Sequence, residues 1–106
     1  MAKVELCGEW AAWHDHMPGS PPTLHVTGTV CFSEGGWGAE LQPRRPGINP
    51  RIQRLELVVT SEGDAHTEAL TEREVHWSED TDAEFDQVEV FGDSVETKIL
   101  DVLQTS

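Results

Sequence analysis

The chain has 106 residues and a net charge of −13, and no run of apolar residues approaches the length of a membrane span. This length predicts a single domain over residues 1–106. The acidic balance argues against binding to nucleic acid or to an anionic membrane, because both would be repelled. The N-terminus has no apolar signal segment, so we expect a cytoplasmic protein.

Short apolar runs alternate with turn signals along the whole chain, a rhythm typical of all-β domains. The expected strands are 4–13, 24–32, 37–41, 53–60, 68–77, 85–91 and 95–103. Seven short strands predict a single antiparallel β-sandwich of the immunoglobulin-like kind, with a small β-barrel as the alternative. The last run also has apolar residues at helical spacing, so a short C-terminal helix stays open there.

The first two runs predict a hairpin around Gly19. Leu24, Val26, Gly28, Val30 and Phe32 fall on one face at period two. Antiparallel pairing about Gly19 sets Trp10 opposite Gly28, which matches a large side chain with the smallest residue. A shift by one residue would turn acidic side chains of the first strand into the core, so we expect this register to be well specified.

The same register places Cys7 directly opposite Cys31 on the outer face. A cross-strand disulfide is geometrically feasible there. In a cytoplasmic protein, however, two cysteines are expected to be reduced, so we predict free thiols.

The segment Trp13–Met17 carries the most suggestive group of metal ligands. In an extended chain His14 and His16 point to the same side, and Met17 adds a soft thioether. This combination suits copper, or zinc with Asp15 as a hard ligand. Because two ligands do not complete a site, no cofactor is expected, and copper or zinc binding through His14, His16 and Met17 is the alternative.

A Pro-rich loop is expected from Gln42 to about Arg51, and the segment Gln42–Arg54 around it holds four of the seven basic residues: Arg44, Arg45, Arg51 and Arg54. Guanidinium groups could bind an acidic partner segment or an anion. They could equally pair with the protein's own carboxylates, because residues 55–106 contain fifteen acids against only Arg73 and Lys98.

The stretches 21–30, 40–43, 47–50 and 55–60 resemble a group of small uncharacterised bacterial proteins. That resemblance implies a compact all-β domain and no particular activity.

No catalytic motif or phosphate-binding loop stands out in the sequence, so an enzyme is the less favoured class. We expect a small acidic binding or assembly module, which recognises a protein partner or itself through the Arg-rich loop or an exposed strand edge.

Overall fold

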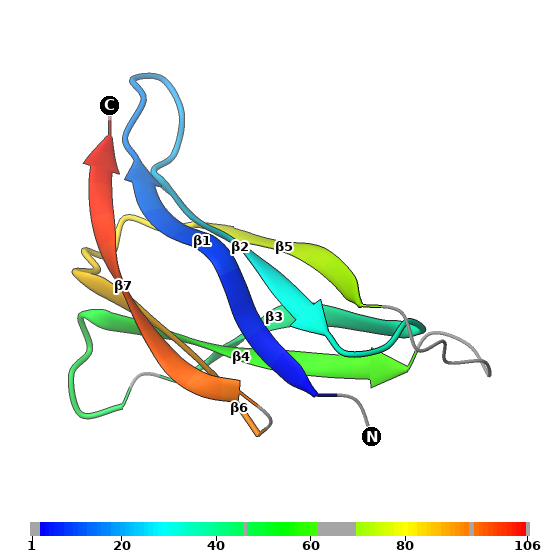
Figure 1. Cartoon of the computed structure of the whole chain (residues 1–106). Helices are drawn as coiled ribbons and strands as arrows, with labels where there is room; N and C mark the ends of the chain where they lie inside the picture. The colour runs from blue at the N-terminus through cyan, green and yellow to red at the C-terminus, as the bar shows by residue number, and fades with distance from the viewer. Residues whose placement is uncertain (1–2, 46, 62–69, 94, 106) are drawn as a thin grey trace.

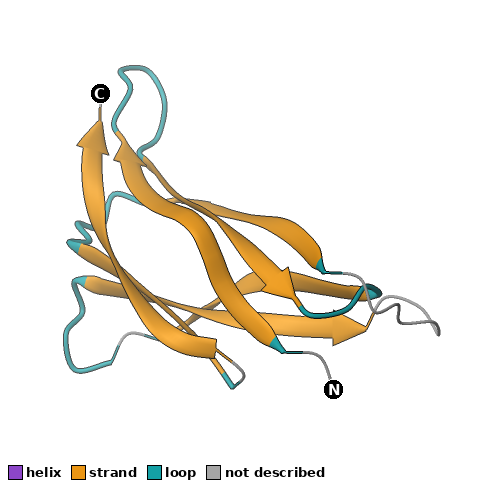
Figure 2. Ribbon diagram, in the orientation of Figure 1, coloured by secondary structure: helices purple, strands orange, loops and turns teal. Residues whose placement is uncertain are grey.

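The computed structural model describes residues 3–45, 47–61, 70–93 and 95–105. It is all-β, and no helix occurs in these ranges (Figure 2). The prediction of seven strands is confirmed, with bounds that differ by a few residues; the start of the fifth predicted run, at 68–69, lies outside the described residues. The strands are β1 (Val4–Asp15), β2 (Thr23–Phe32), β3 (Trp37–Arg44), β4 (Ile52–Ser61), β5 (Thr71–Asp80), β6 (Gln87–Gly92) and β7 (Val95–Thr105).

The strands form one sheet in the order β3-β4-β6-β7-β1-β2-β5. Its edge strands β3 and β5 come into contact, so the sheet curls almost into a closed barrel (Figure 1). The barrel alternative therefore describes the fold better than the immunoglobulin-like sandwich, which is not confirmed. The expectation of purely antiparallel pairing is wrong, since β4–β6 and β1–β7 are parallel pairs. Period-two alternation fixes which face of a strand is buried, but not the neighbour or its direction.

The last run is a strand and not a helix. β7 pairs with β6 over Val95–Asp101 and with β1 over Val102–Thr105. A helix with its apolar residues at helical spacing on one face would have buried Ile99. In the structure 48% of Ile99 is exposed, whereas Leu100 is buried. Two hydrogen-bonding neighbours satisfy the backbone of this run better than an isolated helix of marginal length would.

The core lies on the concave side of the sheet. The predicted inner row of β2 is confirmed, because Leu24, Val26, Val30 and Phe32 are buried. Strands β4 and β6 contribute further buried side chains, among them Leu55, Val88 and Val90. On β5 the guanidinium Nε of Arg73 donates to the backbone oxygen of Trp37 at 3.3 Å, which links the two edge strands.

The hairpin register is correct in part. Ala12 pairs with Val26 as predicted, but Leu6 pairs with Val30 and not with Phe32. The pairing shifts by two residues between Cys7 and Ala11, where Gly8 adopts a φ of 65° and β1 bulges opposite Gly28. Because side chains alternate with a period of two, a register shift of two residues leaves each side chain of β1 and β2 on the same face of the sheet. The predicted core face is therefore unchanged by the bulge.

Candidate functional site

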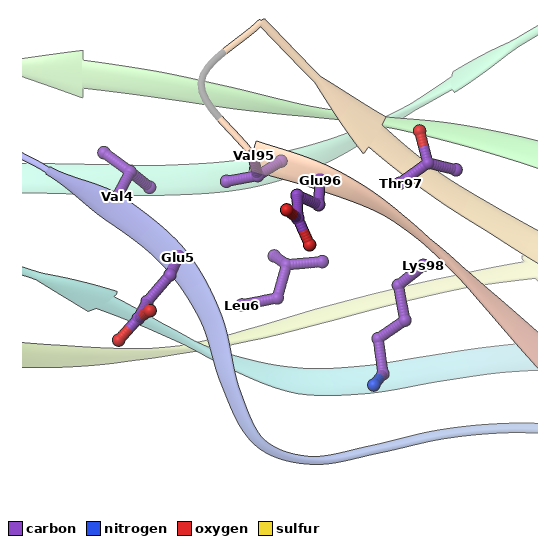
Figure 3. A pocket seen from close by; sticks show the side chains of 7 residues that line it. All are labelled: Val4, Glu5, Leu6, Val95, Glu96, Thr97 and Lys98. Atoms are coloured by element: carbon purple, nitrogen blue, oxygen red, sulfur yellow. The ribbon is translucent and has the colours of Figure 1, made fainter.

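A cleft of about 430 Å³ opens between β1 and β7. The two strands pair only at one end, over Ala12–Asp15 and Val102–Thr105, and separate toward the other (Figure 1). Figure 3 shows the side chains that line the resulting space. They are Val4, Glu5, Leu6, Val95, Glu96, Thr97 and Lys98.

Each strand that borders the cleft is paired on its far side only. Residues 4–7 of β1 pair with β2, and residues 95–101 of β7 pair with β6. Among the described residues no strand pairs with the edges that face the cleft. Backbone N–H and C=O groups along such an edge are a template for a further strand.

The cleft has an apolar floor and a charged rim. The half-buried side chains of Val4, Leu6 and Val95 pack against the hydrophobic core. Glu5, Glu96 and Lys98 are exposed. A strand bound here would bury alternate side chains against the floor and keep the others near the rim, in keeping with the period of two.

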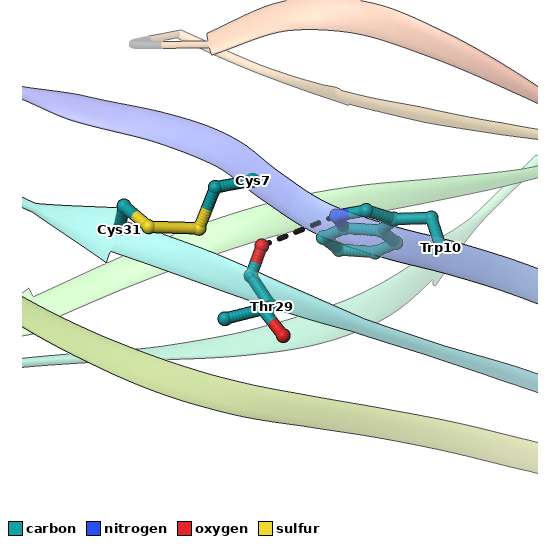
Figure 4. Close-up of a disulfide and its surroundings, with 4 residues drawn as sticks. All are labelled: Cys7, Trp10, Thr29 and Cys31. Carbon is teal, nitrogen blue, oxygen red and sulfur yellow. Dashed lines mark hydrogen bonds between the residues drawn. A yellow bond between two sulfur atoms is a disulfide. The ribbon is translucent and has the colours of Figure 1, made fainter.

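A disulfide and a tryptophan fix the β1 side of the cleft (Figure 4). Cys7 and Cys31 are bonded, with 5.9 Å between their Cα atoms, so the prediction of free thiols is wrong. Because of the bulge they are diagonal rather than directly opposite, yet they share the outer face. The indole Nε1 of Trp10 donates to the backbone oxygen of Thr29 at 3.1 Å, and its ring lies over Gly28, as the predicted Trp10–Gly28 match requires.

The structure brings His14 and His16 together at the end of β1, with 4.3 Å between their ring centroids. His14 is fully buried, and its Nε2 donates to the backbone oxygen of Thr81 at 2.7 Å. His16 is exposed, and its Nε2 donates to Oε1 of Gln104 at 2.7 Å. Met17 lies in the loop that follows β1 and is 55% exposed. No group of three or more His, Cys, Asp or Glu ligands forms within the described ranges.

The predicted Arg-rich loop is partly strand, because Arg44 ends β3 and Arg54 lies in β4. Its arginines are engaged largely with the protein's own acids. Arg44 pairs with Glu56 at 2.8 Å, and Arg54 pairs with Glu89 at 2.6 Å. The guanidinium of Arg54 also lies 4.3 Å from the ring centroid of Phe91. Arg45 is exposed. These contacts favour the internal-pairing interpretation of Arg44 and Arg54.

Arg51 makes the closest contact between this loop and the acidic segment after β5. Its Nε and Nη2 donate to the two carboxylate oxygens of Asp86 at 2.7 and 2.9 Å, and Nη1 lies 3.8 Å from Glu84. The hydrogen bonds from Arg51 hold the pKa of Asp86 below its usual value, and those to Asp86 raise the pKa of Arg51. Arg51 is thus used as a structural contact between the β3–β4 connection and the β5–β6 connection.

Sequence reasoning missed the cleft. Its residues carry no motif, because the cleft exists only where β7 leaves β1, and a parallel pairing of the first and last strands has no local signal.

Comparison of this chain with protein-family models, curated proteins and solved structures found no match. In the part of the chain that the structure describes, none of the segments forms a helix long and apolar enough to cross a membrane.

Proposed function

We propose that this protein is a binding module that accepts an extended, positively charged segment of a protein partner in the β1–β7 cleft. The observation that carries the proposal is the pair of unpartnered strand edges on either side of an apolar floor. Addition of a strand would supply main-chain hydrogen bonds to these edges, and alternate side chains would fill the floor.

Charge supports the choice of a basic occupant. The chain carries a net charge of −13, and two of the three charged residues that line the cleft, Glu5 and Glu96, are acidic. Complementary charge raises the rate of encounter and disfavours acidic competitors. The Arg-rich loop is a weaker candidate for the binding surface than its composition indicated, because Arg44, Arg51 and Arg54 are paired internally.

Selection from a displayed library of random 12-residue peptides tests this function. We expect the enriched peptides to be cationic with alternating apolar residues. The double variant Glu5→Lys/Glu96→Lys should bind them about tenfold more weakly, since both rim charges become repulsive. The matched control is Glu72→Lys/Glu74→Lys, which changes the net charge equally on exposed positions of β5 and should bind them more tightly than the cleft variant.

Equal affinity of the two double variants would place the peptide outside the cleft and refute the proposal. Native mass spectrometry of the same proteins tests whether a second copy of the chain occupies the cleft instead of a peptide. A dimer that dissociates only in Glu5→Lys/Glu96→Lys would retain the cleft as the binding site and change its occupant. A monomer from which no peptide is selected would overturn the function altogether.

A second candidate function is metal binding through His14 and His16. One observation favours it: Nδ1 of His14 is buried and has no hydrogen-bond partner. A backbone carbonyl only accepts, so the Nε2 that faces Thr81 carries the proton and Nδ1 keeps a free lone pair. Histidine ligands commonly donate their other ring N–H to such a carbonyl.

Calorimetric titration with zinc or copper tests this candidate. We expect His16→Gln to weaken binding about tenfold or more, because one of two imidazole ligands is lost. His16 is chosen because it is exposed, so the fold should tolerate the substitution, whereas His14 is part of the buried interior. Affinity unchanged by His16→Gln would rule this pair out.

A further inference from the structure

A row of rings crosses three adjacent strands on the outer face of the sheet. Trp13 of β1 pairs directly with His25 of β2, and their rings stack with 5.0 Å between centroids and 19° between planes. On the other side of β2, His76 of β5 lies diagonally from His25, since it pairs with Thr27. Neither the proposed cleft nor the His14–His16 pair includes these residues.

The two imidazoles of this row meet edge to edge. Nδ1 of His25 and Nε2 of His76 are 3.4 Å apart, the ring planes differ by 10°, and the centroids are 5.7 Å apart. The distance between the two ring centroids equals the distance between the two facing nitrogens plus the distance from each nitrogen to the centroid of its own ring. The two nitrogens therefore lie on the line between the centroids, and the rings share nearly one plane. One nitrogen donates its proton to the lone pair of the other.

This separation matches the requirement of a shared metal ion. Two imidazole nitrogens bound to a tetrahedral ion at about 2.0–2.1 Å lie about 3.4 Å apart. The ligands come from two paired strands, and the stacked indole of Trp13 restrains the ring of His25. The nitrogens already have the required separation, and the two rings must tilt toward a point beside the line between them for both lone pairs to reach an ion that replaces the shared proton. The ring that donates moves its proton to its outer nitrogen, so both facing nitrogens become ligands.

The surroundings of His76 are suited to a cation. This residue lines a shallow hollow of about 440 Å³ together with Glu9 and Glu74. The two carboxylates raise the local concentration of cations around His76. The two histidines are not part of any larger group of His, Cys, Asp or Glu ligands in the ranges that the structure covers, so solvent would occupy the remaining positions.

We propose that His25 and His76 form a two-histidine site for a divalent transition-metal ion of the zinc or copper class, for which imidazole is a favoured ligand. The site is separate from the cleft between β1 and β7, and it does not depend on the proposed peptide-binding function.

Zinc titration followed by NMR of the histidine ring resonances tests the site. We expect the resonances of His25 and His76 to move together and to saturate at one equivalent. His25→Gln and His76→Gln should each weaken zinc binding about tenfold or more. His16→Gln is the matched control, because it removes one imidazole from the other pair, and zinc should still move the resonances of His25 and His76 in it. Circular dichroism verifies that the variants keep the strand signal of the parent.

Copper(II) gives a second readout through Trp13, which stacks on one of the ligands. Binding should quench part of the tryptophan fluorescence, and the quenched part should disappear in Trp13→Phe and in His76→Gln. The proposal is overturned if His25→Gln leaves the zinc-dependent shift of the His76 ring resonances unchanged. It is also overturned if zinc moves the resonances of His14 and His16 while those of His25 and His76 stay in place.

Discussion

Replacement of Gly28 by alanine is expected to lower the free energy of unfolding by about 3 kcal/mol or more. A Cβ atom at this position would lie 2.0 Å from Cδ2 and 2.2 Å from Cε2 of Trp10. The indole cannot retreat without breaking its hydrogen bond to Thr29 and leaving its place against the core. Urea denaturation of the parent and the variant measures the loss.

Two further variants make this measurement decisive. Gly47→Ala is the matched control, because a Cβ there meets only Cδ of Arg54 at 3.9 Å, and it should change stability by less than about 1 kcal/mol. In a Trp10→Leu background the cost of Gly28→Ala should shrink, since the clashing ring is gone. A cost of Gly28→Ala below that of Gly47→Ala would contradict the packing described for Trp10.

Loss of the disulfide should have a similar effect. The bond joins Cys7 and Cys31 across 24 positions. The entropy of closing a loop of this length in the unfolded chain corresponds to about 3.5 kcal/mol. We expect the double variant Cys7→Ala/Cys31→Ala to lose about that much stability, as measured by urea denaturation under oxidising conditions.

Reduction provides the internal control. A thiol reductant should destabilise the parent to nearly the level of the double variant and should leave the double variant unaffected. Hydrogen exchange should also accelerate in residues 4–7 of β1, because the bulge at Gly8 separates them from the rest of the strand. A parent that is equally stable with and without reductant would show that the bond contributes nothing.

The parts of the fold that were predictable from sequence are those that depend on period two. The alternation of β2 identified its buried face, and the match of Trp10 with Gly28 located the partner strand. The bulge was not predictable, because Gly8 is compatible with regular and with left-handed backbone alike. The disulfide illustrates the same limit: the shared face of Cys7 and Cys31 followed from the pattern, but their oxidation did not.

Some features of the candidate sites were likewise predictable from the sequence, and others were not. That His14 and His16 share one side follows from their spacing, and the internal pairing of Arg51 and Arg54 follows from the excess of acids in residues 55–106. The β1–β7 cleft and the His25–His76 pair depend on which strands become neighbours. Long-range pairing of that kind is specified by the whole core and not by any single segment.

The position of β7 in the sheet has a consequence for synthesis of the chain. β7 is the last strand in sequence, and among the residues that the structure describes it alone joins β3, β4 and β6 to β1, β2 and β5 by backbone pairing. While the ribosome still holds residues 95–105, these two groups of strands have exposed edges and no strand between them. The nascent protein must therefore keep these edges apart from other chains until translation of β7 is complete, a period in which chaperones that cover strand edges would be of most use.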